Sequence, residues 1–205
     1  MCARYTLTAE EKELIRQGSY TIDGPYAPDA NIAVSDIGYV VTSQEPSVVQ
    51  RMFWGIDKSF ASFNIRSEDV METPNFSKLL DAGNFCVILA DGFYESEELT
   101  RDDKRPWRFV TERKVFAFLG LWTEVPAAVS GETERRYAIF TCRANNIVGE
   151  IHPYDRMPVI LSRADEDFVL RKKPTAEQLL ALCVPYPDRL MNRYRVSKQV
   201  LPVST

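Results

Sequence analysis

Short apolar runs recur through the chain, and most have the length of a β-strand rather than that of a helix. Runs of this length predict strands when they are rich in β-branched and aromatic residues and bounded by turn residues. The first two runs are separated by Gln44-Glu45-Pro46, so we expect them to form a hairpin. The predicted strands cover 37–42, 48–54, 62–66, 85–90, 107–111, 115–122, 136–142, 157–161 and 193–197.

Helix start and stop signals frame a second set of segments. Thr8 and Glu11 match the capping-box pattern, and Gly18 offers a C-terminal stop. Thr73 supplies an N-cap that is followed by a proline at the first helical position, and Gly83 offers the next stop. The predicted helices cover 9–17, about 74–82, 144–151, 164–171 and 175–183.

The order of these elements favours an α+β fold. Strands dominate the middle of the chain, whereas the helices are short. No internal repeat, low-complexity segment or change of composition marks a linker within 1–205. We therefore predict a single domain with a curved, mainly antiparallel β-sheet core and peripheral short helices.

The charge and histidine counts limit the possible chemistry. The 205 residues include 25 Lys and Arg against 29 Asp and Glu, which gives a formal net charge of −4, and a single His. A protein that follows DNA by charge alone needs a surplus of cations, so any contact with nucleic acid has to be local. One histidine rules out metal sites built on two histidines, and we expect neither a metal nor another cofactor. If histidine does chemistry here, the residue is His152.

The hydropathy pattern also bears on location. No stretch approaches the roughly 18 apolar residues that a membrane span requires. Residues 1–16 mix charges with a polar helix start and lack the apolar centre of a signal peptide. We expect a cytoplasmic monomer with no membrane partner.

The four cysteines differ in their surroundings. Their spacing matches neither zinc sites nor a disulfide framework, and Cys86, Cys142 and Cys183 lie in or at the end of apolar runs, which predicts core packing. Cys2 becomes the N-terminal residue once Met1 is removed. It then carries a thiol and an α-amine, with reference pKa values of about 8.5 and about 7.7 to 8, on adjacent carbons. The pair can act as an amine-assisted thiol nucleophile, or it can condense with an aldehyde to a thiazolidine.

Two further segments carry candidate polar residues. Strand alternation from 64 to 68 places Asn64, Arg66 and Glu68 on one face. Glu95 closely follows the buried run 85–90, where a carboxylate is well placed for a raised pKa and for acid–base work.

Together these segments resemble the SOS-response-associated peptidase (SRAP) family, whose members protect abasic sites in single-stranded DNA. The resemblance starts at Met1-Cys2-Ala3-Arg4-Tyr5 and continues through 53–55, 64–68, 91–95 and 152–158. The blocks fall in family order across 1 to about 162, and this order makes the resemblance specific. It implies a compact, β-rich α+β domain.

The resemblance implies four catalytic residues. Cys2 would form a covalent thiazolidine with the ring-opened aldehyde of an abasic site. Asn64 would hydrogen-bond the N-terminal region and the opened sugar. Glu95 would shuttle protons during imine formation and ring closure. His152 would sit beside the deoxyribose and assist ring opening or later reversal.

The resemblance also implies a DNA partner. Arg4, Arg66 and Arg156 would hold phosphates that flank the lesion in single-stranded DNA containing an abasic site. Two alternatives stay open: a peptidase in which Cys2 is an N-terminal nucleophile and self-processing is the main reaction, and a non-catalytic domain of SRAP-like shape.

The chain departs from the family's pattern in several places. Ala3 replaces the usual Gly and removes backbone freedom beside Cys2, and Val34 replaces a Pro. The segment after Gly55 is short, with Phe60 and Phe63 as the candidates for stacking on bases.

A further departure is an insertion. Pro153 and Tyr154 stand between His152 and the block 155–158, and they alter how His152 is placed relative to Arg156.

Several conspicuous residues have structural explanations. Trp54, Trp107 and Trp122 lie in or beside predicted strands and are expected to pack in the core or at its edge. The charged cluster 101–105 is typical of a solvated hairpin tip, and the cationic run 171–173 of a helix C-terminus.

Overall fold

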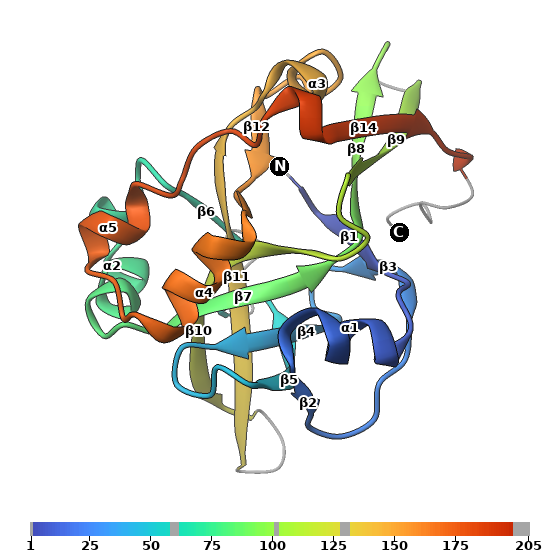
Figure 1. The fold of residues 1–205 in the computed structure, drawn as a ribbon. Helices are drawn as coiled ribbons and strands as arrows, with labels where there is room; N and C mark the ends of the chain where they lie inside the picture. The colour runs from blue at the N-terminus through green and yellow to red at the C-terminus, as the bar shows by residue number, and fades with distance from the viewer. Residues whose placement is uncertain (1, 58–61, 101–102, 128–131, 199–205) are drawn as a thin grey trace.

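Two β-sheets form the centre of the computed structural model, which describes residues 2–57, 62–100, 103–127 and 132–198 (Figure 1). The smaller sheet has the strand order β14 (Met191–Arg195), β9 (Lys104–Thr111), β8 (Gly92–Glu98), β1 (Arg4–Leu7) and β3 (Asp29–Ala33). The larger sheet has the order β12 (Arg156–Pro158), β11 (Thr133–Arg143), β10 (Phe116–Pro126), β7 (Phe85–Ala90), β4 (Ile37–Thr42), β5 (Val48–Trp54) and β2 (Thr21–Ile22). Two short strands join it at the side, β6 (Asn64–Arg66) on β11 and β13 (Ile160–Leu161) on β10.

The larger sheet closes on itself. Strands β11, β10, β7, β4 and β5 are antiparallel neighbours in this order, and β11 also pairs in parallel with β5. This last pairing turns the row into a ring, which requires strong curvature. The expected α+β class with a curved, mainly antiparallel sheet is confirmed, as is the hairpin formed by β4 and β5.

The helices lie around the sheets (Figure 1). Helix α4 packs against β7, and α2 contacts β10. None of the helices in the described part of the chain has the length and apolar character needed to cross a membrane. The α-helices are α1 (Glu11–Gly18), α2 (Pro74–Asp81), α3 (Asn146–Gly149), α4 (Arg163–Arg171) and α5 (Ala176–Leu180), and the 3₁₀ helices are η2 (Val70–Glu72) and η3 (Asp188–Leu190).

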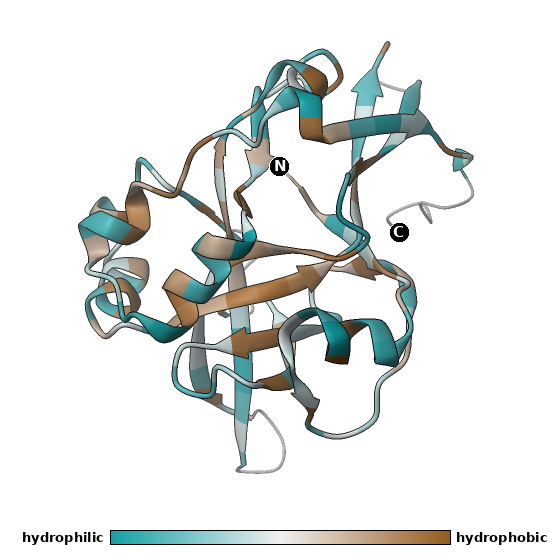
Figure 2. Cartoon of the chain, viewed as in Figure 1, coloured by the Kyte–Doolittle hydropathy of each residue, from teal (hydrophilic) through white to brown (hydrophobic). Residues whose placement is uncertain are grey.

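The core lies between the sheets and under the helices. Strand β7 is buried along its whole length, and hydrophobic colour marks it in Figure 2. Trp54 is buried as expected, Trp122 is 6% exposed, and Trp107 lies partly buried at the core edge. Cys86 and Cys142 pack in the core as predicted, whereas Cys183 is only partly buried.

A glycine in β4 makes room for a pair of tyrosines below the N-terminal strand. The hydroxyls of Tyr5 and Tyr137 lie 2.6 Å apart and share a buried hydrogen bond. A Cβ added at Gly38 would lie 2.2 Å from each of these hydroxyls. Gly38 therefore allows β1, which begins just after Cys2, to dock on the ring of strands.

The cap predicted for the first helix is wrong. Glu10 is the N-cap of α1 and forms a capping box with Glu13, whereas Thr8 donates its hydroxyl and its backbone N–H to Asp91. The carboxylate of Asp91, which lies between β7 and β8, thus outcompetes the local cap. Strands β1, β2, β3 and β8 were not predicted, and β9 begins at Lys104, inside the expected hairpin tip. Of that tip, 101–102 lie outside the described residues.

Asp91 joins the N-terminal strand to the sheet. Its buried carboxylate accepts hydrogen bonds from Thr6 Oγ1, from the backbone N–H groups of Thr8 and Ala9, and from Arg108 Nη2 at 2.9 Å. This set of donors satisfies both oxygens, as a buried carboxylate requires. Asp91 therefore anchors the segment that begins at Cys2.

Replacing Asp91 with alanine is expected to lower the free energy of unfolding by about 3 kcal/mol, because the partly buried Arg108 guanidinium and two backbone donors lose their acceptor. Urea denaturation at pH 7 measures this change. The matched control is Asp167→Ala, which removes an exposed helix ion pair with Arg171 and should cost no more than about 0.5 kcal/mol. Equal losses in the two variants would contradict the anchoring role of Asp91.

Candidate functional site

Four side chains from distant parts of the chain converge near the start of β1. Cys2 precedes β1, Asn64 opens β6, Glu95 lies in β8, and His152 follows α3. Each is buried, with exposed fractions of 1%, 6%, 7% and 4% respectively. The structure therefore gathers the whole set of candidate catalytic residues in one place.

Asn64 fixes the backbone of Cys2. Its Nδ2 donates a hydrogen bond of 2.7 Å to the carbonyl oxygen of Cys2, while its buried Oδ1 has no hydrogen-bond partner among the described residues. Asn64 is held in turn because β6 pairs in parallel with β11. One amide thus positions the N-terminal segment and presents a free acceptor beside it.

The expected common face of residues 64 to 68 is only partly correct. Strand β6 ends at Arg66, so Glu68 falls in a turn beyond the alternation. There the Glu68 carboxylate pairs with Arg156. Glu68 is therefore a partner of a predicted DNA-binding arginine, not a neighbour of Asn64 on a strand face.

Glu95 and His152 form a buried acid–base pair. Glu95 Oε2 lies 3.6 Å from His152 Nε2, and Glu95 Oε1 has no hydrogen-bond partner among the described residues. Burial raises the pKa of Glu95 from its ordinary 4.5 to about 8, and burial lowers the pKa of His152 from 6.5 to about 4. At neutral pH the carboxyl group holds its proton and the imidazole is uncharged.

The thiol of Cys2 is also kept neutral. Its Sγ donates a weak hydrogen bond to the carbonyl oxygen of Arg4 at 3.5 Å. Burial, together with the charge of Glu95, raises the pKa of Cys2 well above the ordinary range of a thiol. A reaction at this sulfur therefore has to remove its proton during bond formation.

A cavity of about 360 Å³ opens beside two of the four candidates, Glu95 and His152, whereas Cys2 and Asn64 are not among its lining residues. Glu95 and His152 line it together with Arg4, Lys104 and Tyr154. Lys104 pairs with Glu98 across the β8–β9 hairpin at 2.6 Å. Sequence reasoning missed Lys104 because it belongs to the cluster assigned to a solvated tip, and only the pairing of β8 with β9 carries it to the cavity.

The three predicted DNA-binding arginines have different surroundings. Arg4 lines the cavity and donates to Asn31 Oδ1 at 3.0 Å. Strands β6 and β12 flank β11, so Arg66 and Arg156 lie on either side of it. Arg156 donates to the Thr141 carbonyl oxygen at 2.7 Å. Arg66, with 55% of its side chain exposed, lies 3.8 Å from the carboxylate of Asp69.

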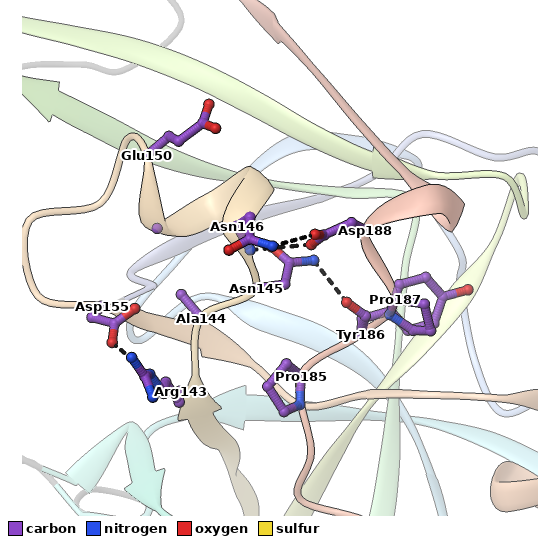
Figure 3. Close-up of a pocket in the computed structure, with 11 residues that line it drawn as sticks. Arg143, Ala144, Asn145, Asn146, Glu150, Asp155, Pro185, Tyr186, Pro187 and Asp188 are labelled. Carbon is purple, nitrogen blue, oxygen red and sulfur yellow. Dashed lines mark hydrogen bonds and ion pairs between the residues drawn. The ribbon is translucent and has the colours of Figure 1, made fainter.

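A second cavity, of about 820 Å³, is lined by residues of the segments 143–146, 149–150 and 185–188 and by Asp155 (Figure 3). Its polar side chains have partners within the protein. Arg143 Nε lies 3.0 Å from Asp155 Oδ2, Asn146 Nδ2 donates to Asp188 at 2.6 Å, and Asn145 Nδ2 donates to the Tyr186 carbonyl. Because these groups are satisfied, the smaller cavity with its unpaired Glu95 oxygen is the better candidate site. No cluster of three or more metal-binding side chains occurs within the described ranges.

The aromatic candidates for base stacking after Gly55 are not supported at this site. Phe63 is 2% exposed and packs edge-on against Trp54, with ring centroids 5.9 Å apart. It belongs to the core, and the stacking role predicted for it is wrong. Phe60 lies outside the described residues.

Comparisons with known proteins match the chain along most of its length. Residues 1–203 fit the sequence profile of the family described as SOS response associated peptidase (SRAP). The chain is 32% identical to the abasic site processing protein YoqW of Bacillus subtilis over 214 residues, which covers 98% of this chain and 94% of YoqW. It is 27% identical to the abasic site processing protein HMCES of Gallus gallus, over 71% of this chain and 54% of that protein.

The fold has a close structural counterpart. A crystal structure of a protein from Bacteroides thetaiotaomicron superimposes with a TM-score of 0.88 at 18% identity, covering 99% of this chain and 95% of that one. A protein from Bordetella bronchiseptica superimposes with a TM-score of 0.81 at 19% identity, covering 96% and 100%. The match of profile and relatives along nearly the whole sequence places the chain in the SOS response associated peptidase family.

Proposed function

We propose that this protein processes abasic sites by capturing them in single-stranded DNA through a covalent bond to Cys2. The observation that carries the proposal is a cavity that contains a buried, proton-bearing carboxyl group and a neutral imidazole and is lined by Ala3 and Arg4, the residues that follow Cys2. The names of the relatives, abasic site processing proteins, support the same lesion.

The reaction balances without an oxidant or a reductant. Removal of Met1 gives Cys2 a free α-amine, whose nitrogen attacks the aldehyde carbon of the ring-opened abasic sugar. The resulting carbinolamine loses water to form an imine. The sulfur of Cys2 then adds to the imine carbon, and the thiol proton moves to the imine nitrogen. The products are a five-membered thiazolidine and one water molecule.

The buried pair supplies the proton transfers. Loss of water needs an acid, and the raised pKa of Glu95 keeps a proton on its carboxyl group near neutral pH. Opening of the sugar needs a base for the anomeric hydroxyl, and the lowered pKa of His152 keeps its imidazole unprotonated. Asn64, which holds the Cys2 carbonyl, offers its free Oδ1 to a sugar hydroxyl.

The arginines bind the DNA backbone in this proposal. Arg4, Arg66 and Arg156 exchange their contacts with Asn31, Asp69 and Glu68 for phosphate oxygens on either side of the lesion. Because the net charge is −4, these few local contacts give a short footprint and weak binding to undamaged DNA.

The test is a denaturing gel. The purified protein, with loss of Met1 established by intact mass, is mixed with single-stranded DNA that carries one abasic site. We expect a heat-stable band of reduced mobility. The control DNA carries a tetrahydrofuran residue at the same position, which lacks the aldehyde and should give no band. Absence of a band with abasic DNA would overturn the proposal.

A further inference from the structure

The insertion after His152 forms a tight turn at the edge of the candidate site. The backbone N–H of Asp155 donates to the His152 carbonyl oxygen at 3.2 Å, which makes Pro153 and Tyr154 the central residues of a β-turn. Proline suits the first central position because its ring presets φ. The far end of the turn is fixed, since Asp155 pairs with Arg143 and its carbonyl accepts from a backbone N–H. The turn from 152 to 155 therefore has a fixed conformation.

Tyr154 projects from this turn into water. It is 66% exposed, the largest value among the exposed large hydrophobic residues of the described chain. Its ring meets the ring of His152 at an interplanar angle of 82°, with centroids 5.5 Å apart. This edge contact orients the tyrosine and leaves most of its surface open. An aromatic ring held in this way, without cover, has the properties of a stacking surface.

The surroundings of Tyr154 suit a single strand of nucleic acid. Tyr154 lines the cavity that also contains Glu95 and His152, and the cations Arg4 and Lys104 line it too. Proteins bind single-stranded DNA by combining cations for the phosphates with aromatic rings on which the bases stack. A base beside the lesion would lie within reach of Tyr154 when the opened sugar occupies the cavity.

We propose that Tyr154 stacks on the base next to the abasic nucleotide and thereby holds the DNA strand at the cavity that contains Glu95 and His152; this role rests on the proposed function. Stacking strengthens with the area of the base, so a purine beside the lesion binds more tightly than a pyrimidine. Tyr154 acts as a binding and specificity residue and takes no part in proton transfer.

Fluorescence of 2-aminopurine tests the contact directly. The probe stands next to a tetrahydrofuran residue in single-stranded DNA, so binding is measured without covalent chemistry. We expect quenching on binding of the unmodified protein and of Tyr154→Phe. Tyr154→Ala should lose the quenching and raise Kd about tenfold, a typical loss for one stacked base. The control Tyr194→Ala removes an exposed tyrosine that lies outside the cavity and should behave as the unmodified protein does.

Crosslinking to true abasic DNA separates stacking from a structural role. At saturating DNA, Tyr154→Ala should form the crosslink at the unmodified rate with an unchanged pH profile. A reduced saturating rate with unchanged Kd would mean that Tyr154 only supports His152, and it would overturn the inference. Equal quenching by Tyr154→Ala and the unmodified protein would also overturn it. If the unmodified protein binds and quenches but forms no crosslink, the proposed function fails while the stacking contact stands.

Discussion

Replacing Cys2 with serine is expected to abolish the heat-stable crosslink with abasic DNA. Serine is small enough to allow removal of Met1, so the variant keeps the α-amine and still forms an imine with the aldehyde. The hydroxyl is a much weaker nucleophile than the thiol, and the unclosed imine hydrolyses on heating. Adding borohydride should therefore restore a band, because reduction converts the imine into a stable amine.

Cys183→Ser is the control for loss of a thiol, because Cys183 is partly buried at a distance in sequence from the candidate site. It should crosslink as the unmodified protein does. A heat-stable band with Cys2→Ser at full intensity would show that another nucleophile captures the aldehyde. If the unmodified protein cleaved peptides, and only this reaction depended on Cys2, the peptidase alternative would replace the proposed function.

Strands with an unbroken apolar run were predictable from the sequence. Strand β7 is buried on both faces and was predicted with its exact bounds, 85–90. Strand β8 was missed because its last residues are acidic, and its strand form depends on pairing with β9 rather than on its own pattern. Strand β1 is only four residues long, and the contacts of Asp91 and Tyr5 hold it in place. Such strands arise from tertiary contacts that no local pattern encodes.

The candidate site was predictable as a set of residues but not as an arrangement. Family resemblance named Cys2, Asn64, Glu95 and His152, whereas their convergence needs β6 and β8 to reach the N-terminus from different sheets. The direction of the Glu95 pKa shift was expected from its place after a buried strand. The alternation expected from 64 to 68 does not reach Glu68, because β6 has three residues and ends at Arg66.

The closing of the larger sheet could not be predicted either. The pairing of β11 with β5 joins residues about 80 positions apart in the chain, Tyr137 with Trp54, and sequence periodicity carries no information on such pairing. This closure matters for the site because β11 also pairs with β6, which contains Asn64, and with β12, which contains Arg156.

Replacing Glu95 with glutamine is expected to slow capture of abasic DNA by about 10²- to 10⁴-fold, the usual effect of removing a general acid. The amide keeps the size of the side chain but cannot give a proton to the departing water. Rates of crosslink formation at saturating DNA measure the change. The control Glu97→Gln, two residues along β8, keeps an acceptor for Trp107 Nε1 and should leave the rate unchanged. An unchanged rate in Glu95→Gln would remove Glu95 from the mechanism.

The pH dependence gives Glu95 a second, independent signature. Capture should decline above about pH 8 as Glu95 loses its proton, and the glutamine variant should lack this decline.

The free energy of unfolding should also depend on pH through Glu95. Between pH 4.5 and about 8 the unfolded chain releases the Glu95 proton while the folded protein retains it, so the contribution of Glu95 to stability falls as pH rises. His152 acts oppositely, raising stability with pH between about 4 and 6.5. His152 is present in both the unmodified protein and Glu95→Gln, so its contribution drops out when their urea midpoints are subtracted. From pH 5 to pH 8 the midpoint of Glu95→Gln should rise steadily relative to that of the unmodified protein. A constant difference across this range would mean that Glu95 is ionised in the folded protein at neutral pH and cannot serve as the acid.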